Sequence, residues 1–203
     1  MKKWIVIVFI SLFTVALAKN PITVKYNESS DNPEIRGILG ALDAYQVTST
    51  LYADSLDAKY YSLWMVICKG EETQRRLMGY YPIQTDSTVI MLTAVPKDST
   101  NVVIYADRIN GAPRHQVNIP TAGRLLIGCD YSWEFGENDT IPLIGYSSGI
   151  HSKINLGNGI VADRFDICGL RFSKERPLLW REKYGLSDYL YFEVIPVKNM
   201  KFY

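Results

Sequence analysis

The chain has 203 residues, enough for one domain of ordinary size. Hydrophobic residues make up 47% of the chain and charged residues only 21%, which excludes a chain that is disordered throughout. The formal net charge is +1, and it falls to −1 if an export signal containing Lys2 and Lys3 is removed. A near-neutral chain argues against nucleic acid as a partner, because such partners are held largely by net positive charge.

Residues 1–18 have the three parts of a cleavable export signal. Two lysines start it, an apolar run covers residues 4–15, and Ala16-Leu17-Ala18 matches the small-x-small pattern that signal peptidases cleave. The run is short for a membrane span, and no later segment approaches 18 apolar residues, so we expect no span after cleavage. We therefore predict a signal peptide at 1–18, a single domain at 19–203, and a secreted, periplasmic or cell-surface location. The short Lys-Lys start is typical of bacterial signals.

The mature chain is predicted to begin with a short strand at residues 22–26 and then one short helix. Asn32 suits the N-cap and Pro33 the first helical position. Apolar residues then recur at helical spacing. These are Ile35, Ile38, Leu39, Leu42 and Tyr45. Two glycines weaken this helix by roughly 1 kcal/mol each, so we expect it to depend on tertiary contacts.

From Gln46 onward, short segments rich in β-forming residues alternate with turn residues, which indicates an antiparallel β fold. Residues 60–69 are apolar on both alternations, as in a strand covered on both faces. Asn110-Gly111 and Asn158-Gly159 predict tight hairpin turns. Further strands are predicted at 74–84, 88–95, 101–107, 115–119, 123–129, 141–146, 164–172 and 187–197, with a helical turn near 178–183. The predicted fold is a mostly β, antiparallel two-sheet sandwich, with a jelly roll as one form of it.

The sequence contains no convincing catalytic or cofactor motif. Gly145-Tyr146-Ser147-Ser148-Gly149 matches the pattern of a nucleophile elbow, but residues 150–159 are β-like where an elbow needs a helix, and no histidine lies far enough downstream. Zinc-ligand spacings and glycine-rich phosphate loops are absent from the sequence, so we expect neither a metal nor a cofactor. The chain has an odd number of cysteines, Cys68, Cys129 and Cys168. Either two of them form a disulfide, or all three remain reduced thiols that pack in the core.

Residues 130–139 hold four acidic and three aromatic residues, which makes this the most unusual stretch of the chain. Its acids do not match the EF-hand spacing, so calcium binding is a weak hypothesis. Tyr131, Trp133 and Phe135 share one face of a predicted hairpin, where they either complete the core or form a ligand platform. Glu134 and Glu137 are nearby acceptors for hydroxyl groups.

The last predicted strand has two different faces. Leu190, Phe192 and Val194 are expected in the core, which leaves Tyr189, Tyr191 and Glu193 on the outer face. Either a second layer covers these rings, or they are exposed and bind a ligand. We predict ligand-binding candidates at Tyr131, Trp133, Glu134, Glu137, Tyr189, Tyr191 and Glu193.

These features favour an exported, non-catalytic binding or interaction module that binds a glycan or a protein surface through exposed aromatic residues. Two alternatives remain. One is an extracellular polysaccharide hydrolase that uses a carboxylate pair, drawn from Glu134, Glu137, Asp163, Asp166 and Glu193. The other is a surface assembly or structural protein whose exposed rings contact another subunit.

Overall fold

The computed structural model describes residues 22–53, 56–85, 87–107, 114–129, 135–136, 139–173 and 175–200. The predicted signal peptide and the Asn110-Gly111 turn lie outside these residues. Most of the described chain is β-strand, and the strands pair antiparallel. The strands are β1 (Ile22–Glu28), β2 (Tyr45–Ala53), β3 (Tyr60–Lys69), β4 (Glu72–Pro82), β5 (Thr88–Asp98), β6 (Asn101–Ala106), β7 (Arg114–Asn118), β8 (Leu125–Gly128), β9 (Ile141–Ser147), β10 (Ile150–Gly157), β11 (Ile160–Asp166) and β12 (Asp188–Val197). The helices are α1 (Pro33–Ala41), α2 (Ile167–Arg171), the 3-10 turn η1 (Pro177–Leu179) and α3 (Trp180–Tyr184).

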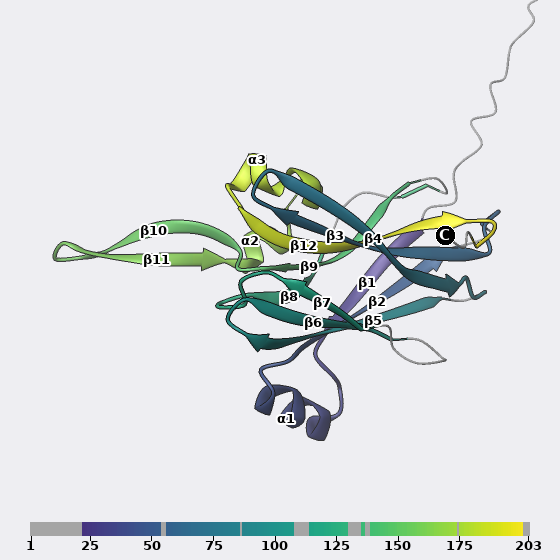
Figure 1. The fold of residues 1–203 in the computed structure, drawn as a ribbon, viewed down its shortest axis with the longest axis horizontal. Coiled ribbons are helices and arrows are strands. Elements are labelled where there is room, and N and C mark those ends of the chain that lie inside the picture. The colour runs from purple at the N-terminus through teal and green to yellow at the C-terminus, as the bar shows by residue number, and fades with distance from the viewer. Residues whose placement is uncertain are drawn as a thin grey trace, which may run out of the picture.

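Two five-stranded sheets contribute to one shared core (Figure 1). Sheet I has the strand order β1-β2-β5-β6-β7, and sheet II has the order β4-β3-β12-β9-β8. The inner core takes fully buried side chains from both sheets, such as Leu51 and Ile90 from sheet I and Met65 and Phe192 from sheet II. The prediction of a mostly β, antiparallel fold is therefore confirmed.

Sheet II buries its outer face as well as its inner face. Along β12, Leu190, Phe192 and Val194 enter the inner core, and Tyr189 and Tyr191 enter a second cluster on the opposite face. We call this second cluster the outer core. A helical layer made of α2, η1 and α3 covers it in Figure 1, and Leu170 and Trp180 come from that layer. The predicted burial of residues 60–69 on both faces is also confirmed, because β3 contributes to both cores.

Strands β10 and β11 form a separate two-stranded ribbon that projects from the body (Figure 1). Asn158 and Gly159 both have positive φ, at 50° and 77°, and they close the predicted hairpin turn. The ribbon leaves large apolar side chains in solvent, including Leu156, Ile160, Val161 and Phe165. This third sheet was not expected from the sequence.

The helices differ from the expectation of one short N-terminal helix. The Asn32 side chain does accept a hydrogen bond from the Glu34 N–H at 2.8 Å, which caps α1. However, no residue of α1 is buried, and Ile38 is 60% exposed, so the tertiary contacts of this helix are limited to a small contact with β2. The predicted strand at 164–172 is correct only for residues 164–166 of β11, because the Asp166 side chain then caps α2 by accepting from the Gly169 N–H at 2.8 Å. Among the described residues, no helix is long and apolar enough to cross a membrane.

None of the three cysteines forms a disulfide in this structure. Cys68 and Cys129 are buried in the outer core, where they pack as small apolar residues. Cys168 is exposed at the start of α2, so it is not the third core thiol that the sequence allowed.

The attachment of the helical layer depends on a glycine. Gly145 of β9 lies beneath Trp180, and a Cβ at this position would stand 2.8 Å from the ring atom Cη2. We therefore expect Gly145→Ala to lower the free energy of unfolding by about 1–3 kcal/mol, as overpacking usually does. Urea unfolding measures this loss.

A double-mutant cycle tests the cause of that loss. Trp180 is fully buried, so Trp180→Ala should destabilise the protein by roughly 3–5 kcal/mol. In the Trp180→Ala background the added methyl of Gly145→Ala occupies space that the ring has left, so it should cost much less. Additive effects of the two substitutions would contradict this packing.

Candidate functional site

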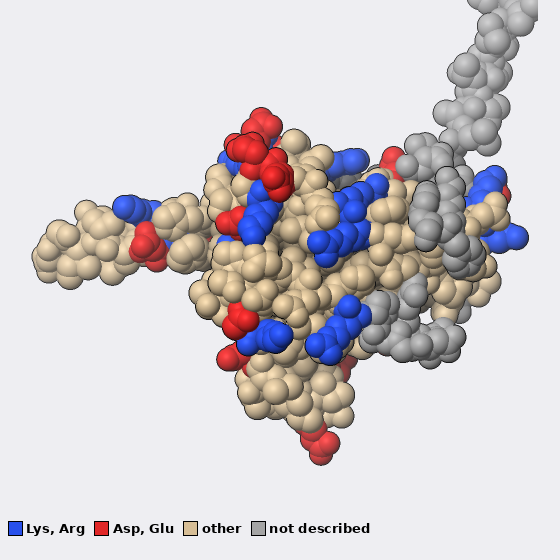
Figure 2. Space-filling model, in the orientation of Figure 1, with Lys and Arg blue, Asp and Glu red and all other residues tan. Residues whose placement is uncertain are grey.

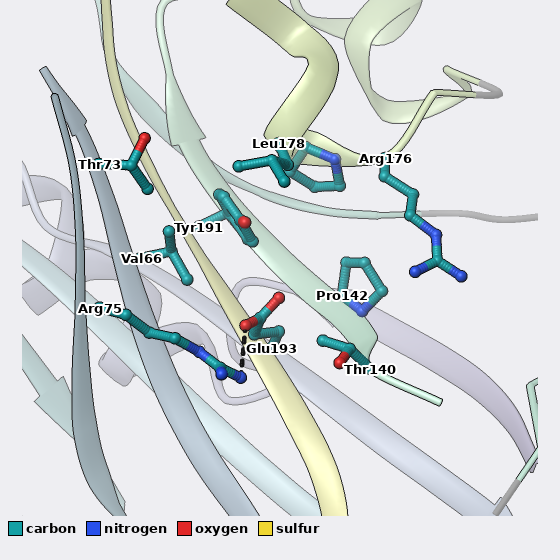
Figure 3. Close-up of a pocket in the computed structure, with 10 residues that line it drawn as sticks. Val66, Thr73, Arg75, Thr140, Pro142, Arg176, Leu178, Tyr191 and Glu193 are labelled. Carbon is teal, nitrogen blue, oxygen red and sulfur yellow. Dashed lines mark ion pairs between the residues drawn. The ribbon is translucent and has the colours of Figure 1, made fainter. Parts of the chain in front are cut away.

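A pocket of about 310 Å³ opens on the outer face of sheet II, beside the helical layer (Figure 3). Its lining comes from β3, β4, β9, β12, the residue before β9, and η1 with the residue before it. The lining residues are Val66, Thr73, Arg75, Thr140, Pro142, Arg176, Pro177, Leu178, Tyr191 and Glu193. The volume lies at the lower end of the ~300–1,000 Å³ range of small-molecule sites.

The register of strands β4, β3 and β12 determines which side chains form the floor of this pocket. Arg75 on β4, Val66 on β3 and Tyr191 on β12 are paired across three neighbouring strands, so their side chains form one row. In the next row Glu193 pairs with Trp64 of β3 and with Pro142 of β9. Because paired residues share a face of the sheet, both rows point into the outer face.

An ion pair crosses the floor from β4 to β12. The guanidinium Nη2 of Arg75 lies 2.7 Å from Oε1 of Glu193, as the dashed line in Figure 3 marks. The same guanidinium lies 4.3 Å from the centre of the Trp64 ring. The Trp64 indole in turn donates to the Ser62 hydroxyl at 3.0 Å, and Ser62 donates to the Ile195 carbonyl at 3.1 Å. This chain of contacts fixes the orientation of Arg75 in the absence of a ligand.

Burial controls the protonation of the two β12 side chains in the pocket. It raises the pKa of Glu193 above the ordinary value, while the Arg75 cation and, to a smaller extent, the Arg176 cation act in the opposite direction. Burial also raises the pKa of Tyr191, and the neighbouring Glu193 carboxylate raises it further. The Tyr191 phenol is therefore a neutral hydrogen-bond donor at physiological pH.

One wall of the pocket is built by the entry to the helical layer. The Tyr189 hydroxyl donates to the Pro177 carbonyl at 2.8 Å, which ties η1 to the outer face of sheet II. Leu178 lies on this wall with 56% of its surface exposed. Arg176, the residue before η1, extends its guanidinium toward the side of the opening that Pro142 lines (Figure 3). Within the described part of the chain, Arg176 forms no salt bridge.

The structure brings two of the predicted binding residues, Tyr191 and Glu193, into this pocket. Of the two alternatives for the rings of β12, coverage by a second layer is confirmed and exposure is wrong, because Tyr189 is 0% and Tyr191 4% exposed. The helical layer covers them, so neither ring is a flat stacking platform. Glu193 is also buried. The other four candidates, Tyr131, Trp133, Glu134 and Glu137, lie outside the described residues.

Sequence reasoning missed three lining or supporting residues. Arg75 and Arg176 were not distinguishable from solvated surface charges, because only the strand register brings Arg75 to Glu193. Trp64 shares its alternation with Val66 and Cys68 on β3, and this was the available signal that it lies on the outer face.

The pocket offers binding groups and little that resembles a catalytic centre. Ser147, the serine of the elbow-like motif, is buried, and β10 comes after it where an elbow needs a helix. Of the candidate acids, Asp163 pairs with His151 on the ribbon at 2.8 Å, and Asp166 caps α2. Among the described lining residues, Glu193 is the single carboxylate. A search of the described residues finds no cluster of three or more His, Cys, Asp or Glu side chains suited to a metal ion.

Comparisons of the chain with protein-family models, with curated proteins and with solved structures found no match.

The raised pKa of Glu193 gives a pH dependence of definite sign. As the pH rises above 4.5, the unfolded chain releases this proton before the folded protein does, so the free energy of unfolding falls until the folded-state pKa is passed. The glutamine of Glu193→Gln cannot ionise, so this variant should lack the decrease in unfolding free energy that the Glu193 carboxyl causes. Urea unfolding over a pH series gives the free energy of unfolding of the wild type and of Glu193→Gln. The difference between the two values at each pH isolates the contribution of the carboxyl.

A second pair of variants controls this measurement. Arg75→Gln removes the cation that opposes the effect of burial, so the fall should extend to higher pH in this variant. Arg164→Gln changes an exposed arginine on the ribbon and should behave like the wild type. A difference curve that is flat from about pH 4 to 8 would show that Glu193 is not in a low-dielectric site.

Proposed function

We propose that the protein is an exported β-sandwich binding module, and that the pocket on the outer face of sheet II is its ligand site. The observation that carries this proposal is the fixed Arg75–Glu193 pair beside Tyr191, in a pocket with apolar walls. Polar groups held in place by a rigid sheet lose little freedom when a ligand binds. The export signal predicted in residues 1–18 supports a secreted, periplasmic or cell-surface location for this module.

A glycan is the ligand class that the pocket chemistry favours. Sugars present hydroxyl groups around an apolar ring, and the pocket combines hydroxyl-binding groups with apolar surface. One oxygen of Glu193 pairs with Arg75, which leaves the other oxygen to accept from a hydroxyl. The Tyr191 phenol is a donor, and Val66, Pro142 and Leu178 supply the apolar contacts. The modest volume favours one terminal sugar unit over an extended chain laid along several exposed rings.

Filling the opening of the pocket tests this proposal. Leu178→Trp places a larger side chain on the exposed wall, so it should abolish binding on a glycan array while the melting temperature changes little. Leu156→Trp is the matched control, because Leu156 is 60% exposed on the distant ribbon. Glycan binding that survives Leu178→Trp, or no binding to any glycan, would contradict the proposal.

A specific observation also favours the second candidate function, assembly with other copies of the chain. The ribbon β10–β11 carries four large apolar side chains that are more than half exposed, and Figure 2 shows its tip without charged side chains. An isolated two-stranded ribbon is marginally stable in water, so contact with another subunit would stabilise it.

Sedimentation measurements distinguish assembly from a purely monomeric module. If the ribbon mediates assembly, the wild type should associate as its concentration rises, and the pair Leu156→Ser with Phe165→Ser should remain monomeric. Leu178→Ser changes an equally exposed leucine away from the ribbon and should associate as the wild type does. A wild type that stays monomeric at all concentrations would eliminate this candidate.

A further inference from the structure

We propose that the pocket on sheet II selects a sugar that carries a carboxylate, with Arg176 as the residue that binds this group. The inference rests on the proposed glycan-binding function and names the ligand class within it. It starts from the charges that line the pocket, which are two guanidinium groups and one carboxylate. The described lining therefore holds one more positive than negative charge.

The two arginines have different roles because their surroundings differ. Arg75 is already occupied, since it pairs with Glu193 at 2.7 Å and packs over the Trp64 ring. Arg176 lies across the opening from Arg75 (Figure 3), and among the described residues it forms no salt bridge, although its charge attracts the Glu193 carboxylate. A guanidinium presents parallel N–H donors that match the two oxygens of a carboxylate. One carboxylate of the described lining therefore serves two guanidinium groups, and Arg176 is the one that forms no salt bridge with it.

The other polar groups favour a sugar over a simple organic acid. Glu193 would repel a carboxylate placed near the floor, so the ligand's charge must lie toward the opening and its hydroxyl groups toward Glu193 and Tyr191. A neutral ring with hydroxyls on one side and a carboxylate on the other fits this polarity. Uronic acids and other sugar acids at the end of a glycan have this arrangement.

Paired probes test the inference with the full chain. One probe is a trisaccharide with a terminal uronic acid, and the other is the same trisaccharide with that carboxyl reduced to the alcohol. Calorimetry should give at least about tenfold tighter binding of the acidic probe, as a charge-assisted contact provides. Arg176→Ala should abolish this preference, so that the two probes bind with equal affinity, and Arg176→Lys should retain part of it. Arg164→Ala, an exposed arginine on the ribbon, is the matched control and should leave the preference intact.

Two competitors identify what the pocket recognises. Free uronic acid should displace the acidic trisaccharide, because one ring fills the pocket, whereas acetate at the same concentration should not. Displacement by acetate would overturn the assignment to a sugar. Equal affinity for the two trisaccharides, or a preference that survives Arg176→Ala, would overturn the inference and leave the glycan-binding proposal standing. Absence of binding to both probes and to every neutral glycan would overturn both.

Discussion

The requirement that β12 bury both of its faces determines how the rest of the molecule is built. One alternation of this strand completes the inner core between the sheets, and the other carries tyrosines that are buried by the helical layer. Without α2, η1 and α3, the rings of Tyr189 and Tyr191 would stand in water beside Val66 and Cys68. The hydrophobic effect therefore holds the helical layer on sheet II, and the Tyr189 hydroxyl fixes its position through the Pro177 carbonyl.

The pocket lies where this coverage ends. Tyr191 is under the edge of the helical layer, and two residues further along β12 the side chain changes from aromatic to acidic at Glu193. A buried carboxylate is costly unless it is paired, and Arg75 supplies the pair from two strands away. Trp64 and Ser62 then restrict Arg75, so the charged floor of the pocket is as rigid as the sheet beneath it. The same interactions that make the boundary stable also give it recognition chemistry.

The alternation of side chains along the strands could be predicted from the sequence, and it correctly separated Leu190, Phe192 and Val194 from Tyr189 and Tyr191. What covers the second face could not be predicted, since the covering segment is short and irregular and has no strong helical periodicity. The apolar character of residues 167–171 favours a strand, whereas a single side chain, that of Asp166, starts a helix there. The pairing of Arg75 with Glu193 depends on registers between strands far apart in the chain, which no local pattern contains.

The position of β12 also has a consequence for how the chain folds. This strand lies between β3 and β9 and is hydrogen-bonded to both, yet it comes after them in the sequence. The contact between Ser62 and Ile195 spans 133 residues, so sheet II is closed by a loop that comprises most of the domain. Such long-range closure slows folding, because the entropy of a large loop is lost before the strand's contacts compensate for it. Until β12 inserts, β3 and β9 both have an open edge, and these two apolar edges are where newly made chains are most vulnerable to pairing with one another.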